Sequence, residues 1–211
     1  MKHLALFVSA CVLLTLTGCV TPPPPKDYTA FHQSNPRSIL VLPPINESAD
    51  IGATYSVLTT TTAPLAELGY YVVPVGIADQ FLKENGLTVP GEIHQVPLQK
   101  LQEVFGCDAV LYLTVKQYGS KYQVFASNTY VSMVGTLVDA RTGTKIWEGK
   151  AEAVYQGQSG LLEALVTQVM NKLFDQAHQV AAMATYQLLL PPGQGLPKGP
   201  RHPEYGRPET K

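Results

Sequence analysis

Apolar and polar positions in the first half of the chain form short runs that are typical of alternating strands and helices. Residues Ile39 to Leu42 are continuously apolar and end at Pro43-Pro44, which predicts a short, fully buried strand of the parallel or central kind. A second strand is predicted at Tyr70 to Pro74, after a glycine that suits the end of a helix. Helices are predicted at 51–61, at 64–68 after a break caused by Pro64, at 77–84 and at 98–105.

The second half changes to strand patterns followed by one amphipathic helix. Strands are predicted at 108–117, 122–126, 128–138 and 145–155, with a hairpin turn over 139–143. Apolar residues recur at helical steps from Leu161 to Val180, with Ser159 as a plausible N-cap, which predicts a long helix packed on a sheet. The fold class is therefore α/β: a mixed sheet of about five strands, two N-terminal βα units, an antiparallel C-terminal meander and a long covering helix.

The apolar run near the N-terminus predicts a targeting signal rather than part of the folded domain. Met1 to Gly18 has a positive start and a hydrophobic stretch that is too short to span a bilayer, as in a secretory signal peptide. The sequence Leu16-Thr17-Gly18-Cys19 resembles the bacterial lipobox. That resemblance implies cleavage between Gly18 and Cys19, and a diacylglyceryl group and an N-acyl chain such as palmitate on Cys19. Val20 stands where an Asp would resemble an inner-membrane retention signal, so the expected location is the outer membrane, facing the periplasm.

Composition divides the mature chain into three parts. Residues 19–37 read as an acylated cysteine followed by a tether, because four consecutive prolines at 22–25 favour extended polyproline II. Residues 38–190 carry the periodic patterns and form the single α/β domain. Residues 191–211 are rich in Pro, Gly and charge, which predicts a disordered tail.

Charge and motifs exclude several classes of function. A formal net charge of −1 over 211 residues, with no basic stripe, gives no reason to expect nucleic acid as a partner. Cys107 is the only cysteine within the predicted domain, and no Cys or His spacing is typical of a metal site. No catalytic or phosphate-binding motif is present. We therefore expect a non-enzymatic protein with no metal and no cofactor beyond the covalent lipid.

Two groups of residues are candidates for sites within the domain. Scattered carboxylates could serve acid–base chemistry on glycan only if they converge in space: Glu47, Asp50, Asp79 and Asp139. Tyrosines are frequent, and aromatic residues are enriched in protein interfaces. The tyrosines predicted as an interface are Tyr70, Tyr71, Tyr118, Tyr122 and Tyr130.

Four stretches carry a resemblance to a known family: "SILVLPPINES", "PLAELGYYVVPV", "GCDAVLYLTVKQYG" and "VGTLVDARTGTKIWEGKA". In this order they resemble a family of Gram-negative outer-membrane lipoproteins without an assigned function, which includes a genome-derived neisserial antigen. More distantly, the chain is similar to the TolB N-terminal domain, CsgG and LpoB. The resemblance implies a small α/β domain that binds proteins in envelope assemblies, and it implies no enzyme activity.

The expected function is an accessory, binding role in a secretion, transport or envelope-assembly system, with an envelope protein as partner. A homodimer is left open. Two alternatives remain. The first is a small-ligand or lipid-binding module that feeds a transporter, which needs a pocket of a few hundred cubic ångströms. The second, less favoured, is an envelope glycan hydrolase.

Overall fold

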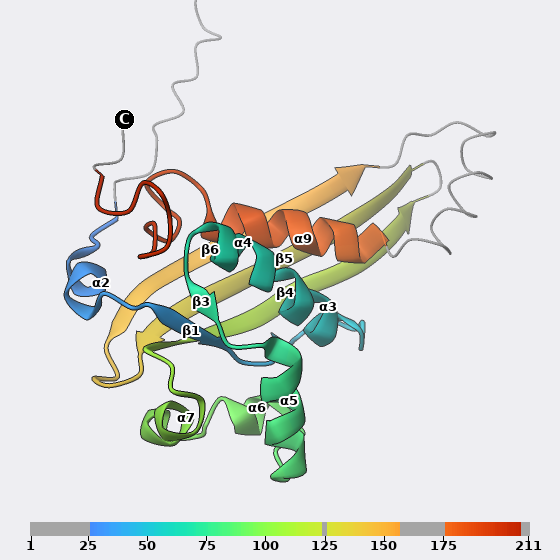
Figure 1. Ribbon diagram of the computed structural model, residues 1–211. Helices are drawn as coiled ribbons and strands as arrows, with labels where there is room; N and C mark the ends of the chain where they lie inside the picture. The colour runs from blue at the N-terminus through green and yellow to red at the C-terminus, as the bar shows by residue number, and fades with distance from the viewer. Residues whose placement is uncertain (1–25, 124–125, 157–175, 208–211) are drawn as a thin grey trace, which may run out of the picture.

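A six-stranded mixed sheet forms the centre of the protein (Figure 1). The computed structural model describes residues 26–123, 126–156 and 176–207. The strands are β1 (Ser38–Val41), β2 (Ile45–Asn46), β3 (Tyr71–Val72), β4 (Ala109–Gln123), β5 (Ala126–Asp139) and β6 (Lys145–Gln156). The described helices are α2 (Thr29–Ser34), α3 (Ala53–Thr60), α4 (Thr62–Glu67), α5 (Val75–Glu84), α6 (Pro90–Ile93), α7 (Leu98–Phe105) and α9 (Gln176–Leu189).

The sheet has the mixed topology that the sequence predicts. Its order is β3-β1-β4-β5-β6, and β2 pairs with β4 outside this path. β1 runs parallel to β3 and to β4, whereas β4, β5 and β6 form an antiparallel meander. The prediction of an α/β fold with βα units before a meander is confirmed, and β2 brings the number of strands to six.

Two apolar cores cover the two faces of the sheet. On one face, α3, α4 and α9 pack on alternate residues of the strands, such as Leu111, Val131 and Met133, which are buried. On the other face, the loops and helices from α5 to α7 cover Leu40 and Val110, in the half of the sheet near β1. The residues that face this side from β5 and β6 are more open to solvent.

The meander differs from the prediction in its strand lengths. The segments predicted at 108–117 and 122–126 belong mostly to one strand, because β4 continues to Gln123 with a bulge between Val115 and Gln117. The predicted turn at Asp139 is confirmed, since its carboxylate accepts hydrogen bonds from the backbone N–H groups of Arg141 and Thr142, both at 2.9 Å, and Gly143 has a φ of 71°.

The covering helix is described only in part. α9 packs on the sheet through buried residues that include Val180, Ala184 and Leu188, as predicted for a covering helix, and it extends to Leu189. Residues 161–175 of the predicted helix, and its predicted N-cap Ser159, lie outside the described residues.

The predicted boundaries of the domain are wrong at both ends. α2 falls within the predicted tether, and its Phe31 side chain is buried in the main core. In the predicted disordered tail, residues 191–207 pack on the domain, with Leu196 in the same core. The physical reason is that each segment buries its few apolar side chains against a surface formed by distant residues, which local composition does not reveal.

Candidate functional site

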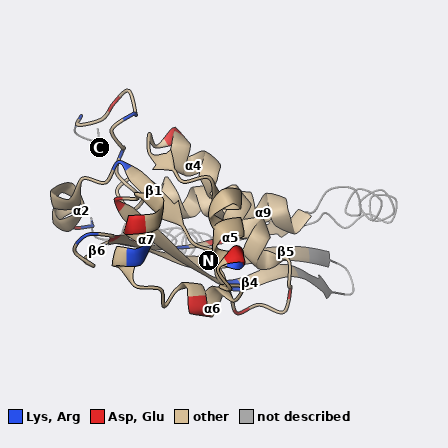
Figure 2. Cartoon of the chain, turned by 60° about the horizontal axis from the view of Figure 1, so that its bottom comes forward, with Lys and Arg blue, Asp and Glu red and all other residues tan. Residues whose placement is uncertain are grey.

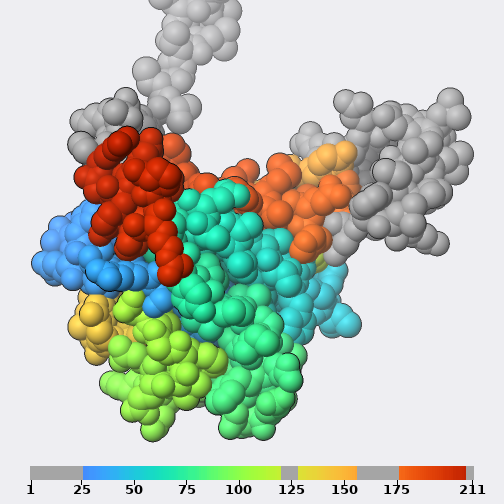
Figure 3. Space-filling view, in the orientation of Figure 1, coloured from blue at the N-terminus to red at the C-terminus, as the bar shows by residue number. Residues whose placement is uncertain are grey.

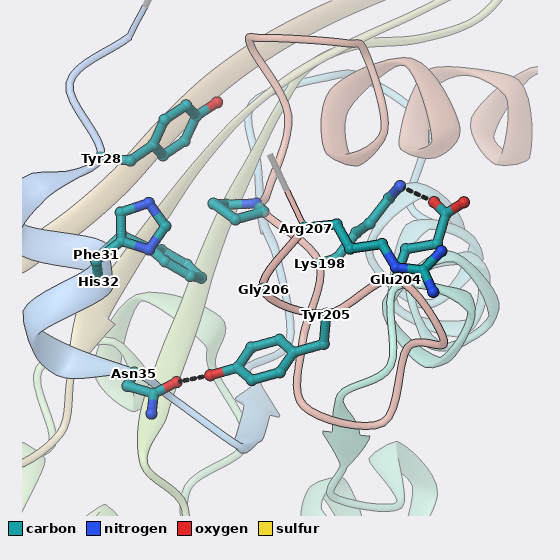
Figure 4. A pocket seen from close by; sticks show the side chains of 10 residues that line it. Tyr28, Phe31, His32, Asn35, Lys198, Glu204, Tyr205, Gly206 and Arg207 are labelled. Atoms are coloured by element: carbon teal, nitrogen blue, oxygen red, sulfur yellow. Dashed lines mark hydrogen bonds and ion pairs between the residues drawn. The ribbon is translucent and has the colours of Figure 1, made fainter. Parts of the chain in front are cut away.

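A pocket of about 660 Å³ lies between α2 and the C-terminal segment, which we define as residues 191–207. Figure 4 shows the side chains that converge on it from these two parts of the chain. The residues that line it are Tyr28, Phe31, His32, Asn35, Pro197, Lys198, Glu204, Tyr205, Gly206 and Arg207. The pocket therefore exists only because both ends of the described chain fold against the domain.

The α2 wall of the pocket is fixed from both sides. Phe31 inserts into the core, and its ring contacts those of Tyr28 and His32 edge-on. Asn35 ends the helix in the left-handed conformation, with a φ of 45°, and its N–H donates to the Phe31 carbonyl oxygen at 2.9 Å. The Asn35 side chain then accepts a hydrogen bond of 2.7 Å from the Tyr205 hydroxyl, which links the two walls.

The C-terminal wall is held by backbone carbonyls that accept hydrogen bonds from buried aromatic residues. The Tyr70 hydroxyl donates to the carbonyl oxygen of Pro197, and Trp147 Nε1 donates to that of Gln194 at 3.2 Å. Gly199 permits this approach, since a Cβ there would lie 2.8 Å from the Tyr70 ring. Burial raises the pKa of Tyr70 far above its ordinary value, so this donor stays protonated.

The start of the described chain is fastened to the same region. The Lys26 ammonium lies 4.8 Å from the centre of the Trp147 ring and donates to the carbonyl oxygen of Gln194 at 2.9 Å and to that of Glu148. Burial lowers the pKa of Lys26, and nearby Glu148 partly opposes this effect. Residue 26 is thus part of the folded domain.

The pocket combines aromatic walls with charges of both signs. Lys198 and Glu204 form an ion pair on one side, and Arg207 lies beside them (Figure 4). The hydrogen bond from Lys198 lowers the pKa of Glu204, and attraction to Lys198 acts in the same direction. Aromatic faces and cations suit the binding of a ligand with an apolar part and an anionic group.

The described part of the chain contains no group of three or more His, Cys, Asp or Glu side chains that could hold a metal ion. Within the same residues, no helix has the length and apolar character needed to cross a bilayer.

The five predicted interface tyrosines do not form one surface. Tyr70 is 3% exposed, so its prediction as an interface residue is wrong: its ring is covered by the C-terminal segment. Tyr71 is exposed, and Arg201 lies over its ring at 5.4 Å. The side chain of Tyr122 lies outside the described residues.

The remaining two tyrosines point to opposite faces of the meander. Tyr118 is opposite the buried Val131 in the β4–β5 register, and its hydroxyl donates to Ser56 Oγ at 2.7 Å, on the face covered by α3. Tyr130 precedes Val131 in β5 and therefore faces the other side.

The four candidate carboxylates are engaged separately. Glu47 pairs with Lys116 at 2.8 Å, Asp79 pairs with Lys83 at 2.7 Å, and Asp50 accepts the Gly52 N–H at 2.8 Å. Asp139 is buried in the β5–β6 turn, next to the start of β4. The backbone N–H of Glu47 donates a hydrogen bond to the carbonyl oxygen of Val115, farther along β4. Each of the four carboxylates therefore has a separate structural partner in the described chain.

The predicted lipidation site and the domain cysteine lie in different parts of the chain. Gly18 and Cys19, the predicted cleavage and lipidation residues, lie outside the described residues. Cys107 is a free, buried cysteine, and burial raises its pKa to about 11. Its environment is that of a small core residue.

An apolar surface that the sequence analysis missed lies on α5 and α7. Ile77 is 68% exposed, Phe81 41% and Val104 50%. The Phe81 ring packs edge-on against Phe105 of α7, with 5.6 Å between ring centres, so the two helices share this surface. The four-residue spacing of Ile77 and Phe81 was the available signal, but the pattern of α5 does not tell which of its apolar residues face the core.

The main relatives of the chain are lipoproteins. The family model described as "Putative lipoprotein GNA1162-like" matches residues 26–201. A lipoprotein from Neisseria meningitidis serogroup B is 46% identical over 213 residues, which cover 97% of this chain and 98% of the relative.

The solved structures that resemble the chain include the following two. The crystal structure of lipoprotein GNA1162 from Neisseria meningitidis matches with a TM-score of 0.55 at 46% identity, and the match covers 65% of this chain and 98% of that one. The PelC dodecamer from Paraburkholderia phytofirmans matches with a TM-score of 0.50 at 15% identity, covering 76% of this chain and 89% of that one. The second likeness shows a shared fold alone.

Proposed function

The chain belongs to the GNA1162-like family of lipoproteins, and from this premise we propose that it is an outer-membrane lipoprotein that faces the periplasm and serves an envelope complex as a non-enzymatic binding component. Cleavage after Gly18 leaves Cys19 as the acylated first residue. A thioether-linked diacylglyceryl group together with an N-acyl chain provides the two or more lipid chains that stable anchoring requires.

The apolar surface on α5 and α7 supports a protein partner. Exposed Ile77 and Phe81 lie one helical turn apart on α5, Phe81 packs on the half-buried Phe105 of α7, and Val104, which precedes Phe105 in sequence, is exposed. An apolar surface shared by two helices is typical of protein contacts. In Figures 1 and 3, α5 lies at the opposite end of the molecule from the C-terminal segment. A partner in a secretion, transport or envelope-assembly complex would bind there without disturbing the pocket.

Crosslinking in intact cells tests this role. A photoreactive amino acid in place of Phe81 should trap one defined envelope protein, whereas the same probe in place of Met183, which is similarly exposed on α9, should not. If both positions trap the same proteins at the same yield, the apolar surface is not the binding site.

Labelling with radioactive palmitate tests the anchor. Wild-type protein should carry the label and fractionate with the outer membrane, whereas Cys19→Ala should lose both properties. An unlabelled wild-type protein would contradict the proposed anchor and leave the partner experiment unaffected.

A second candidate function rests on the pocket. Its volume of about 660 Å³ lies within the range of small-molecule sites, so a small-ligand or lipid-binding module that feeds a transporter is a specific alternative. Native mass spectrometry of protein purified from membranes would reveal a retained ligand, which Tyr205→Ala should release.

A further inference from the structure

We infer that the end of the protein formed by α2, the C-terminal segment and the β5–β6 turn lies against the headgroups of the membrane that anchors the chain, and that the pocket there accepts an anionic phospholipid headgroup. The inference rests on the proposed acylation of Cys19. It adds an orientation of the domain and a second contact with lipid.

Only a short stretch of chain separates the anchor from the folded domain. Lys26 is fixed to Trp147, Gln194 and Glu148, so the folded domain begins at residue 26. The chain from Cys19 to Lys26 is seven residues long and spans at most about 25 Å, whatever its conformation. A tether that reached to residue 37 would have allowed about 60 Å. The domain is therefore confined near the bilayer, and the end that carries Lys26 is the one held closest.

The position of Lys26 decides which surface is held close. It contacts the C-terminal segment and β6, and Tyr28, two residues later, lines the pocket. The Arg141 guanidinium donates to the Ser34 carbonyl oxygen at 2.9 Å, which brings the β5–β6 turn beside α2. The pocket, the turn and the C-terminal segment thus form one end, which we call the tether end (Figure 1).

Charge distinguishes the tether end from the opposite end. The basic residues of the tether end are Lys26, Arg37, Arg141, Lys145, Lys198, Arg201 and Arg207. Figure 2 marks Lys and Arg in blue and Asp and Glu in red along the described chain. Its carboxylates are fewer, namely Asp27, Asp108, Asp139, Glu148 and Glu204, and Asp139 is buried. Away from the tether end, α5 and α6 carry Lys83 against Asp79, Glu84 and Glu92. α7, whose Leu98 lies beside Gly143 of the β5–β6 turn, adds one charge of each sign next to the tether end, Lys100 and Glu103. A surface of anionic lipid attracts the tether end and repels the opposite end.

The pocket adds a site for one headgroup. Arg207 is exposed at its rim, and Lys198 lies in its wall, so a headgroup phosphate can meet cations on entry. The aromatic walls formed by Tyr28, Phe31 and Tyr205 suit the glycerol and upper acyl carbons. Juxtamembrane basic residues and acyl chains are two signals that reinforce each other.

Vesicle flotation tests the lipid contact without the anchor. The probe is the mature chain, residues 19–211, with Cys19→Ser, mixed with vesicles of phosphatidylethanolamine and phosphatidylglycerol or of phosphatidylcholine alone. We expect binding to the phosphatidylglycerol vesicles that weakens with salt, and at least about tenfold weaker binding after Arg37→Glu, Arg201→Glu and Arg207→Glu together.

A matched variant serves as the control. The combination Lys83→Glu, Lys116→Glu and Lys121→Glu makes the same change of charge on α5 and on the part of β4 that is remote from the turn, and it should retain binding. Equal binding to both kinds of vesicle, or equal loss in the two triple variants, would overturn the inference. Melting temperatures identify a variant that fails to fold, and glutamine replacements then take its place.

Energy transfer tests the orientation in the acylated protein. A fluorophore is placed at Gln33→Cys on α2 or at Gln80→Cys on α5, both exposed positions, while Cys107 stays buried. In vesicles that contain a headgroup-labelled acceptor, transfer should be stronger from position 33. Equal or reversed transfer would refute the orientation, whereas an unacylated Cys19 would contradict the proposed anchor and leave the flotation result standing.

Discussion

The Tyr28 hydroxyl donates a hydrogen bond of 2.6 Å to the carbonyl oxygen of Gly195, so residues 167 positions apart in the sequence close the domain together. Trp147 contacts the same junction: Lys26 lies over its ring, and its Nε1 donates to the carbonyl oxygen of Gln194, which also accepts a hydrogen bond from Lys26. The two ends of the described chain are therefore structural parts of the fold, and the stability of each depends on the other.

Removal of the C-terminal segment should destabilise the domain. A stop after Leu190 deletes the buried Leu196 and leaves the buried Tyr70 hydroxyl without its acceptor at Pro197. Loss of one buried Leu and of two or three hydrogen bonds predicts a decrease of at least about 3 kcal/mol in the free energy of unfolding. For a domain of this size the melting temperature should fall by about 6–12 °C. A stop after Arg207 is the control, and equal melting temperatures for the two truncations would contradict the prediction.

Two glycines should respond in opposite ways to alanine. A Cβ on Gly149 would lie 2.5 Å from Trp147 Cζ2 and 3.1 Å from Leu188 Cδ1, so Gly149→Ala should cost about 1–3 kcal/mol of stability. A Cβ on Gly76, within α5, meets nothing within 4 Å, and Gly76→Ala should stabilise by up to about 1 kcal/mol. Urea unfolding of both variants measures the difference, and a loss of stability in both would refute the steric explanation.

The regular elements could be predicted because their patterns are local. α7 spans Leu98–Phe105 as predicted, since its apolar residues recur at helical steps and Gly106 ends it with a φ of 63°. β1 is as buried as its continuous apolar run indicates. The junction of α3 and α4 lies at Thr61 rather than at Pro64, because proline is tolerated in the first turn of the second helix.

The candidate sites could not be predicted because they depend on contacts between distant segments. Nothing in the sequence near Tyr70 indicates that Gly199 will cover its ring, and the Pro- and Gly-rich composition of 191–207 favours disorder when it is considered alone. Likewise, Ile77 and Leu82 are both apolar residues of α5, yet only the packed structure distinguishes the exposed one from the buried one.

Cys107 should be inert in the native protein. Its side chain is in the second core, and burial raises its pKa to about 11, so little thiolate is present at neutral pH. Iodoacetamide should modify Cys107 only after unfolding, whereas the exposed cysteine of Gln33→Cys should react at once. Mass spectrometry of the native, non-acylated protein gives the extent of labelling, and rapid modification of Cys107 would contradict the burial.

Asp139 should make stability depend on acidic pH. Burial of its carboxylate acts to raise the pKa, but hydrogen bonds from Ser34, Thr142 and Arg141 outweigh burial and lower the pKa to about 2. Because the folded-state pKa lies below the unfolded value of about 4, the stabilisation is fully present above pH 4 or so and is lost as the pH falls towards 2. Asp139→Asn should therefore cost about 2 kcal/mol of stability at neutral pH, and the difference from wild type should shrink between about pH 4 and pH 2.

Urea unfolding at several pH values measures this trend, with Glu92→Gln on the exposed side of α6 as a control that should follow wild type. A difference between Asp139→Asn and wild type that stays constant with pH would show that the variant loses packing rather than the stabilised charge.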